Sequence, residues 1–376
     1  GPAHPNRGGI VHFNNRLAQA FQARPDLEVR QYFWSRLYPE CLLPGPAADW
    51  LDMSSRVSFQ IPGQSILDCA NPWSWWQLVR RIQSDGCRIL VTHWVHPVHF
   101  PVFLTVFAAL RLLTDVEIHL IVHNVRPHEG IPWGTHMAKR IMNLAHHVIV
   151  HSASEADIAK NFLEVQTNIK TAFHPVYDFF TTCDDLEHIR TKLGLKNKVL
   201  LFFGFIRPYK GLECLISAFE IFQKRNKDTS LLIVGEFFHT RQKNWDNEYK
   251  ILLDRIKKNG DIIHINEYVP NEDVGIYFSI ADTLVTPYHK VSQSGPVHIA
   301  FALGKPVIAS DLPAFRDSVE AGVTGSFFNP GDPLDLARAM ERVLGQTWDA
   351  DRIKVHGQRF DWERYVEILL DGNVNS

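Results

Sequence analysis

The sequence predicts an α/β protein built on parallel, doubly wound sheets, and two observations support this prediction. In the second half of the chain, short apolar segments of strand length alternate with segments of helical periodicity. Strands that alternate with helices are typical of a parallel sheet covered on both faces. In addition, 376 residues exceed the usual limit of a single hydrophobic core, so we expect two domains of roughly 150–200 residues each.

The composition excludes several classes of protein. The formal net charge is -2 and the isoelectric point lies near 6.9, so we expect no nucleic-acid partner. The five cysteines have no C-x-x-C spacing, which favours a reducing compartment and makes the cytoplasm the default location. No apolar run reaches the ~18–20 residues that span a bilayer, and the first residues do not resemble a signal peptide.

The chain opens on a glycine loop. Gly8 and Gly9 precede a helical pattern that begins at Phe13. A glycine loop that leads into a helix normally follows a strand, and none precedes this loop, so we expect that strand to lie upstream of Gly1. The next predicted strand is Glu28–Phe33.

Two apolar segments follow in the first half. In Asn71–Ile82, Trp73, Trp75 and Trp76 stand close together. Such a cluster can pack in a core, bind a sugar or anchor the chain at a membrane interface, and we favour the core. The segment Phe100–Leu110 reads as a core helix or an interfacial one, and again the core is favoured.

Histidines follow the predicted strand Arg88–Thr92. The spacing of His93, His96 and His99 suggests a zinc site. However, Pro97 interrupts any helix that would align the three rings, and no nearby cysteine or acid completes the site. We therefore do not expect a metal there.

His123 directly follows the predicted strand Val116–Val122. A histidine at the carboxyl end of a parallel strand faces the crevice where ligands bind. A structural histidine is nearly as strong an interpretation. The segment His147–His151 is strand-like, and Asp178–Leu193 reads as the passage into the second domain.

The most informative stretch is the loop that follows the apolar run beginning at Val199. The run stops at Gly204, and an amphipathic helical pattern begins directly after Gly211. Arg207 and Lys210 therefore stand between the end of a strand and the start of a helix, where an open α/β sheet binds its ligand. Two cations beside free backbone donors suit a diphosphate. Ordinary solvated loop charges are the alternative interpretation.

The rest of the second half repeats this alternation. Its regularly spaced segments are Leu231–Val234, Ile251–Ile256, Ile262–Ile265, Asp273–Ile280, Thr283–Thr286, Val297–Ala302, Val307–Ala309 and Leu334–Leu344, with a last helix at Glu363–Leu370.

Several of these motifs together resemble glycosyltransferase family 4, whose members have the GT-B architecture of two facing Rossmann-like domains. The segment LFFGFIRPYKGLECLISAF is similar to the donor-diphosphate loop of that family, and PYHKVSQSGPVHIAFALGKPVIASDLPAFRDSVEAGVTGSFFNPGD is similar to its second signature. The likeness extends to RGGI, IVHNVRPHE, HSASE and the closing FDWERY. It covers nearly the whole chain.

The resemblance implies roles for particular residues. Arg207 and Lys210 would neutralise the nucleotide-sugar diphosphate as the glycosidic bond breaks, at the loop that starts with Gly204. His123 would lie against the donor sugar. The remaining nucleotide-side residues that it implies are Gly8 and Gly9, which would approach the diphosphate, and Tyr268 and Val269, which would hold the base. Family members are retaining and need no enzymic nucleophile, because the leaving phosphate is thought to act as the base.

One departure from the family pattern concerns two glutamates. Counting back from Gly304 places Val291 and Ile299 at the positions where the commonest pattern has these carboxylates. The substitute segment consists of Ser292, Gln293, Ser294 and Gly295. It resembles the variant of several polysaccharide-assembly members, and its hydroxyl, amide and backbone N–H groups can bind sugar hydroxyls and phosphate.

We therefore expect a first domain over residues 1–180, completed by a C-terminal helix at 360–376, and a nucleotide-sugar-binding domain over residues 181–359. The expected function is transfer of a sugar from a nucleotide donor to a hydroxyl of a glycan or lipid-linked glycan.

No D-x-D appears in a convincing loop, so we expect no metal and no cofactor. The alternative is a catalytically degenerate GT-B protein that binds a nucleotide or a glycan; a nicotinamide dehydrogenase is disfavoured because no G-x-G-x-x-G loop follows a strand. Peripheral membrane contact at the inner face of the cytoplasmic membrane, through the two apolar segments of the first half, is a further hypothesis.

Overall fold

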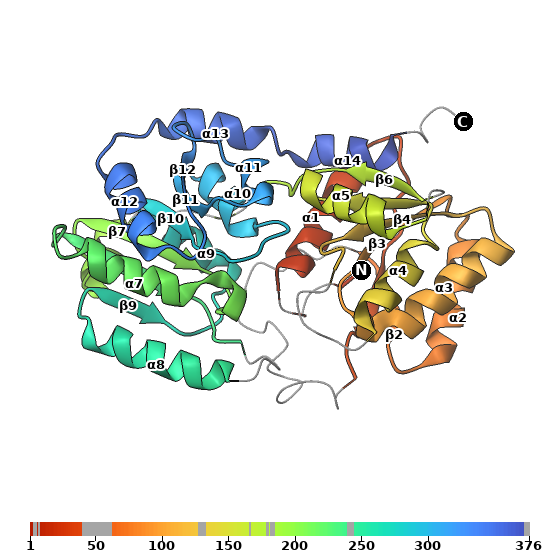
Figure 1. Ribbon diagram of the computed structural model, residues 1–376. Helices are drawn as coiled ribbons and strands as arrows, with labels where there is room; N and C mark the ends of the chain where they lie inside the picture. The colour runs from red at the N-terminus through yellow and green to blue at the C-terminus, as the bar shows by residue number, and fades with distance from the viewer. Residues whose placement is uncertain are drawn as a thin grey trace. The chain divides into compact units, whose positions relative to one another are not determined.

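The computed structural model describes residues 1–2, 6, 8–39, 62–126, 133–164, 167–177, 180, 185–238 and 244–371 (Figure 1). The chain forms two compact units. The first unit runs to Phe173 and takes up the chain again from Trp362, whereas the second runs from His174 to Asp361. The boundaries expected from the sequence were 180/181 and 359/360, so the structure places the first crossing seven residues earlier and the return two residues later.

The first unit is a parallel α/β unit. In chain order its elements are α1 (Gly9–Gln22), β1 (Tyr32–Arg36), β2 (Gln64–Asp68), α2 (Pro72–Ser84), β3 (Ile89–Trp94), η3 (Pro97–His99), α3 (Phe100–Leu113), β4 (Glu117–Val122), α4 (Gly134–Met142), β5 (His147–Val150), α5 (Ala153–Phe162), β6 (Asn168–Thr171) and α14 (Trp362–Leu370). Four strands form one parallel sheet in the order β3-β4-β5-β6, and β1 pairs with β2 in a separate parallel sheet. A cavity of about 460 Å³ borders β1, β3 and α1.

Helices cover the four-stranded sheet in two groups. Helix α3 packs against α2 and α4, while α1 packs against α14 (Figure 1). Apolar side chains form the core, and Phe107, Leu110, Ile118, Leu120 and Val148 are all at most 1% exposed. The buried face of α3 confirms that Phe100–Leu110 is a core helix.

Other expectations for the first unit need correction. Trp73 is 65% exposed and Trp76 is 38% exposed, so the tryptophan cluster does not pack in the core as a whole. Helix α2 turns only one face inward, and of the three only Trp75 packs against the core. The strand expected at Glu28–Phe33 begins at Tyr32 instead. The described residues before Gly8 form no strand, and the strand expected upstream of Gly1 stays a prediction.

The second unit is a doubly wound parallel sheet. Its elements are α6 (Leu186–Lys192), β7 (Lys198–Phe203), η4 (Pro208–Lys210), α7 (Leu212–Phe222), β8 (Thr229–Val234), α8 (Trp245–Lys258), β9 (Ile262–Ile265), α9 (Asn271–Ile280), β10 (Thr283–Thr286), α10 (Gly295–Ala302), β11 (Val307–Ser310), α11 (Pro313–Arg316), β12 (Gly325–Phe328), α12 (Pro333–Leu344) and α13 (Ala350–Gln358). The sheet has six parallel strands in the order β12-β11-β10-β7-β8-β9. Helices α7, α8 and α12 pack together as one layer, and α9 packs against α6 and α10 (Figure 1).

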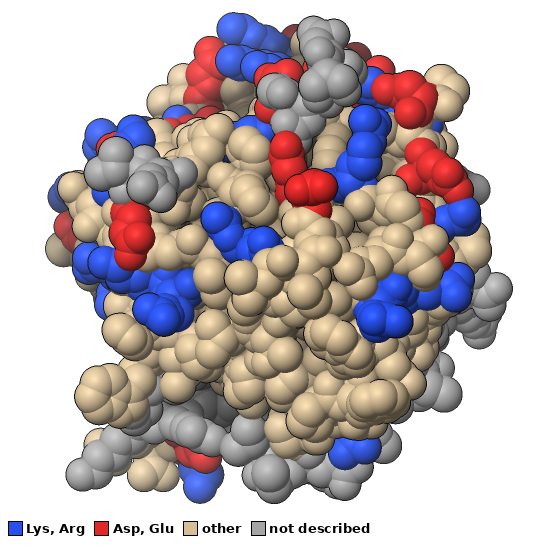
Figure 2. All heavy atoms as spheres, turned by 90° about the vertical axis from the view of Figure 1, so that its right-hand side faces the viewer, with Lys and Arg blue, Asp and Glu red and all other residues tan. Residues whose placement is uncertain are grey.

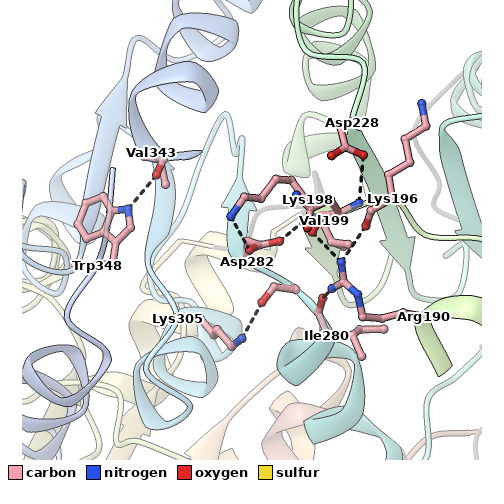
Figure 3. A network of polar contacts seen from close by, with 12 residues as sticks. Arg190, Lys196, Lys198, Val199, Asp228, Ile280, Asp282, Lys305, Val343 and Trp348 are labelled. Carbon is pink, nitrogen blue, oxygen red and sulfur yellow. Dashed lines mark hydrogen bonds and ion pairs between the residues drawn. The ribbon is translucent and has the colours of Figure 1, made fainter. Parts of the chain in front are cut away.

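A polar network at the amino ends of β7 and β10 fixes α6, which the sequence did not predict (Figure 3). The guanidinium of Arg190 donates to the carbonyl of Ile280 at 2.5 Å and to that of Lys196 at 2.7 Å. Asp282 accepts from the backbone N–H of Val199 at 2.8 Å and from the ammonium of Lys198 at 3.4 Å. These bonds satisfy backbone groups at the edge of the sheet opposite the ligand edge. They hold the ends of the two central strands together.

The order of strands in the second unit has a consequence for ligand binding. Read from β9, the sheet runs 3-2-1-4-5-6 in order of appearance, which is the dinucleotide-binding order. The direction of winding reverses between β7 and β10. In open α/β sheets, ligands bind beyond the carboxyl ends of the strands at this switch point.

Candidate active site

The loops after β7 and β10 meet at this switch point. The backbone N–H of His289 donates to the carbonyl of Tyr209 at 2.8 Å. Gly211 has a positive φ of 68°, and a Cβ there would lie 1.9 Å from the carbonyl oxygen of Pro287. Only glycine allows this approach in this conformation. The two motif loops of the second unit are therefore packed against each other.

Lys210 is a buried cation in the first of these loops. Only 8% of the residue is exposed, and its ammonium donates at 3.5 Å to the carbonyl of Phe203. Burial, together with the neighbouring charge of Arg207, lowers the pKa of Lys210 to about 7. Within the described ranges, no carboxylate forms an ion pair with Lys210. An anion bound here would supply the missing charge.

Arg207 lies in the same loop and is partly buried. Its guanidinium carbon is 3.9 Å from the ring centroid of Phe238, a cation–π contact that orients the planar group. Gly204 has a φ of 95°, and a Cβ on it would lie 3.0 Å from the ammonium of Lys210. The glycine therefore leaves the room that the lysine head group occupies.

Aromatic side chains gather at the carboxyl ends of β7, β8 and β9. The ring of Phe205 lies 5.6 Å from Phe238 and 6.3 Å from Tyr268, centroid to centroid. Tyr268 and Val269 follow β9, and Val269 is 8% exposed. Aromatic rings grouped in this way can receive a planar base.

The loop after β10 leads into α10 through the segment that replaces the family's carboxylates. Its residues are Ser292, Gln293, Ser294 and Gly295. Both serines are buried, and Ser294 is the N-cap residue of α10 without a side-chain capping bond. A Cβ on Gly295 would lie 3.3 Å from the ring of Tyr177. Ile299 is 5% exposed, so that family carboxylate position is an apolar core position here.

A pair of buried histidines connects α10 to the segment that precedes α6. His174 and His298 stack with ring centroids 5.3 Å apart and an interplanar angle of 15°. Burial lowers the pKa of His174 to about 4 and that of His298 well below its ordinary value. Both rings are therefore neutral at neutral pH and pack as aromatic groups.

In the first unit, His123 follows β4 and is 6% exposed. Its Nε2 is 3.1 Å from Nδ1 of His93, and Nε2 of His93 is 3.2 Å from Oδ1 of Asn14. The ring of Phe13 meets both imidazoles edge-on, at 5.4 Å from His123 and 5.6 Å from His93. This chain of contacts fixes the orientation of His123 and links it to α1.

Gly8 and Gly9 stand at the start of that same helix. Gly8 is the N-cap residue with a φ of 115°, and a Cβ on either glycine would meet nothing within 4 Å. The structure therefore places Gly8, Gly9 and His123 in the first unit, connected through α1. It brings Arg207, Lys210 and Gly204 together with the loop after β10 and with Tyr268 in the second unit.

Several residues of the site escaped the sequence analysis. His93 was considered only as a zinc ligand, yet it is the hydrogen-bond partner of His123. Glu155 accepts from the backbone N–H of Val125 at 2.7 Å and so holds the loop that carries His123. Gly235, with a φ of 146°, packs against Gly204, since a Cβ there would lie 2.3 Å from that residue's carbonyl oxygen. Its signal was visible as a glycine directly after an apolar strand segment.

The comparisons with known proteins agree with this geometry. Residues 185–359 match the family model described as Glycosyl transferases group 1. The predicted resemblance to glycosyltransferases is therefore confirmed, and the matched segment coincides with most of the second unit.

One curated relative is the alpha-monoglucosyldiacylglycerol synthase of Acholeplasma laidlawii, 28% identical over 165 residues, which are 43% of this chain and 39% of the relative. The chain spans about half the length, or less, of the curated relatives that it matches.

Two solved structures show the fold. The lipopolysaccharide outer core galactosyltransferase WaaB has a TM-score of 0.66 at 14% identity, with 98% of this chain and 97% of that chain covered. HepE of Anabaena, solved in complex with UDP, has a TM-score of 0.65 at 18% identity and covers 83% of this chain and 86% of its own. The GT-B fold with parallel sheets is confirmed.

Proposed function

We propose that the chain is a glycosyltransferase that moves a sugar from a nucleotide-diphosphate sugar to a hydroxyl of a glycan or a lipid-linked glycan, with retention of configuration. One observation carries the proposal: a buried lysine beside an arginine, at the switch point of a parallel sheet, with no carboxylate partner in the described part of the chain. A buried cation is costly unless it is paired. A diphosphate is the partner that fits this position, at the end of a strand and the start of a helix.

The residues of this loop suit the departure of a leaving group. As the bond between the anomeric carbon and the diphosphate oxygen breaks, its electron pair passes to the diphosphate. Lys210 and Arg207 would stabilise that added charge without being consumed, because they are fixed before the reaction. The proton of the acceptor hydroxyl would pass to an oxygen of the leaving phosphate, so no nucleophile from the protein is required. His123 of the first unit, whose orientation is fixed by its contact with His93, would contact the donor sugar.

The donor is best sought among uridine nucleotides first, because HepE was solved with UDP. The aromatic group formed by Phe205, Phe238 and Tyr268 offers stacking faces for any base. A thermal-shift and hydrolysis screen over nucleoside diphosphates and nucleotide sugars tests the proposal, since a ligand that binds only the folded state raises the melting temperature.

The screen needs matched variants. Arg207→Ala and Lys210→Ala are expected to lower turnover by on the order of 100-fold or more with the fold intact. Lys224→Ala, at an exposed lysine of the same unit, is the control and should change nothing. Near-normal turnover in both site variants would refute the assigned role. Nucleotide binding without any turnover would instead favour the degenerate binding protein, and the anomeric configuration of the product, read by NMR, tests retention.

We also propose peripheral contact with a membrane through α2 and the end of α3, at the cytoplasmic face. Trp73 is 65% exposed, Leu112 is 82% exposed and Leu113 is 52% exposed, on two helices that pack against each other. Figure 2 views the side on which Figure 1 shows α2 and α3, and uncharged residues form a broad area there, with Lys and Arg as well as Asp and Glu at separate points around it. Within the described residues, no helix has the length and apolarity needed to cross a bilayer.

Flotation with liposomes that contain anionic lipid tests this contact. The protein is expected to float with the liposomes, and the double variant Trp73→Ser/Leu112→Ser should stay in the soluble fraction. Val355→Ser, at a residue 62% exposed in α13, is the control for simple loss of apolar surface. A wild-type protein that stays soluble would contradict the proposal.

A further inference from the structure

We propose that Glu117, His119 and His147 form a zinc site at the amino ends of β4 and β5, separate from the sugar-transfer site. One ligand atom from each residue lies within 4.8 Å of those of the other two. The Oε2 atom of Glu117 lies 3.4 Å from Nε2 of His119 and 3.7 Å from Nε2 of His147. Bonds of about 2.0–2.2 Å in a tetrahedral arrangement put two ligand atoms about 3.4 Å apart. The two spacings from Glu117 to the histidines approach that value.

The backbone fixes this arrangement. Glu117 and His119 are two residues apart in one strand, so both side chains point to the same face of the sheet. His147 stands beside His119 in register on the neighbouring parallel strand. The backbone N–H of Glu117 donates to the carbonyl of Arg88 at 2.8 Å, and that of Ile118 donates to Nδ1 of His146 at 2.9 Å. A metal would therefore meet ligands whose main chain is already held in place.

Burial and accessibility also suit a bound ion. The side chain of His119 is fully buried and that of His147 is 14% exposed, whereas the side chain of Glu117 is 41% exposed. The ion can enter past the glutamate, and water can complete its coordination. Two imidazoles and one carboxylate are a donor set that zinc accepts.

Two features limit the affinity. The positive charge of Lys170 lowers the pKa of both histidines and would repel a dication. Its ammonium donates hydrogen bonds to the carbonyls of Leu369 at 3.1 Å and Asp371 at 2.7 Å. Nδ1 of His147 has no hydrogen-bond partner in the described part of the chain, whereas zinc-binding histidines normally donate from their second nitrogen. We therefore expect micromolar rather than tighter binding.

The position separates this site from the proposed chemistry. Glu117 is the first residue of β4 and His123 follows its last, which at a rise of about 3.3 Å per residue puts them ~20 Å apart. The zinc would thus connect the amino ends of β4 and β5 and would not contact the donor.

Titration of the untagged protein with Zn²⁺ by calorimetry tests the inference, with Co²⁺ absorption as a second readout of tetrahedral coordination. We expect one ion per chain. Glu117→Gln and His147→Asn should each weaken binding at least tenfold, and Lys170→Met should strengthen it. His188→Asn, at an exposed histidine of the second unit, is the control and should bind like the wild type.

The conservative change Glu117→Gln keeps the size of the side chain, so loss of binding in it cannot be attributed to misfolding if its melting temperature without metal is unchanged. Absence of saturable binding in the wild type would overturn the proposal. So would full binding in the double variant Glu117→Gln/His147→Asn. Nucleotide binding should be the same in all of these proteins, which keeps the result independent of the proposed transferase activity.

Discussion

At the scale of single residues, the protonation of Lys210 is the property most open to measurement. Its pKa lies at about 7 because the ammonium is buried and stands near Arg207. A bound diphosphate would raise that pKa, since the negative charge favours the protonated form. Below pH 7 the lysine is already charged, so binding needs no proton. Above pH 7 binding must take up a proton, and affinity must fall as the pH rises.

We therefore predict that affinity for a nucleotide sugar decreases between pH 7 and pH 9 by up to about tenfold per pH unit. Calorimetry at pH 8 in two buffers of different ionisation enthalpy should detect uptake of up to one proton per ligand. Lys210→Arg keeps the charge at all these pH values and should show neither effect. Equal heats in both buffers for the wild type would contradict the prediction.

The contact between His93 and His123 predicts a second effect at this scale. His93→Leu removes the hydrogen bond to Nε2 of His123, so the ring loses its fixed orientation. Misplacement of a reacting group by about 1 Å can cost on the order of 100-fold in rate. Turnover should fall by that order, while nucleotide affinity, which depends on the second unit, should not change.

The matched variant is His93→Asn, whose side chain keeps a polar atom near the position of Nδ1 and should restore part of the rate. Separate measurement of turnover and of nucleotide binding decides the matter. If His93→Leu turned over substrate at the wild-type rate, His93 would be a packing residue only.

At the scale of elements, Gly211 allows the loop after β7 to pack closely against the loop after β10. Gly211 ends the turn η4 and begins α7, and no side chain fits between it and Pro287. The loop after β7 therefore cannot move without the loop after β10. This coupling joins the cations to the serine-rich segment that leads into α10.

Gly211→Ala should lower stability and nucleotide affinity together. The left-handed conformation alone costs an alanine roughly 1–2 kcal/mol, and the contact with the Pro287 carbonyl adds a further cost that displaces one loop. Gly194→Ala is the control, because Gly194 has a φ of 65° but nothing lies within 4 Å of a Cβ there. Denaturant unfolding and calorimetry should show a small loss of stability in the control with unchanged binding. Equal effects of the two variants would rule out the coupling.

At the scale of the whole molecule, the chain leaves the first unit at Phe173 and returns to it at Trp362. Helix α14 then packs on α1, and the hydroxyl of Tyr365 lies 2.8 Å from Nε2 of His151. Tyr365 is fully buried, and its ring also meets that of Phe13 at 5.5 Å. The last helix is therefore part of the core that supports His123.

Tyr365→Phe removes one buried hydrogen bond and should reduce the stability of the first unit by about 1–3 kcal/mol. Hydrogen exchange should show faster exchange in α1, α5 and α14 and no change in the six-stranded sheet. The exposed-site variant Val355→Ser, in α13, should leave both patterns unchanged. Uniform loss of protection across both units would show that they unfold as one.

The class of fold and the position of the loop that carries Arg207 and Lys210 could be predicted from local patterns in the chain. Alternating apolar and helical segments fix local conformation, and parallel strands end at one edge of a sheet, so Arg207 and Lys210 could be placed at a strand end without a structure. The segment Ser292–Gly295 was located by its resemblance to the family pattern. Periodicity could not tell which face of α2 is buried, and it missed short elements such as α6 and β12, whose residues are fixed by contacts with distant segments.

The pairing of distant residues could not be predicted and is seen in the folded structure. His151 and Tyr365 are 214 positions apart, and His93 and Asn14 are 79 apart. The lowered pKa of Lys210 also depends on the folded structure, because it follows from burial. The approach of His147 to Glu117 depends on it as well, because it follows from strand register. Sequence patterns encode the local backbone, but register and burial arise from packing between elements. That packing assembles a site from residues that no local pattern connects.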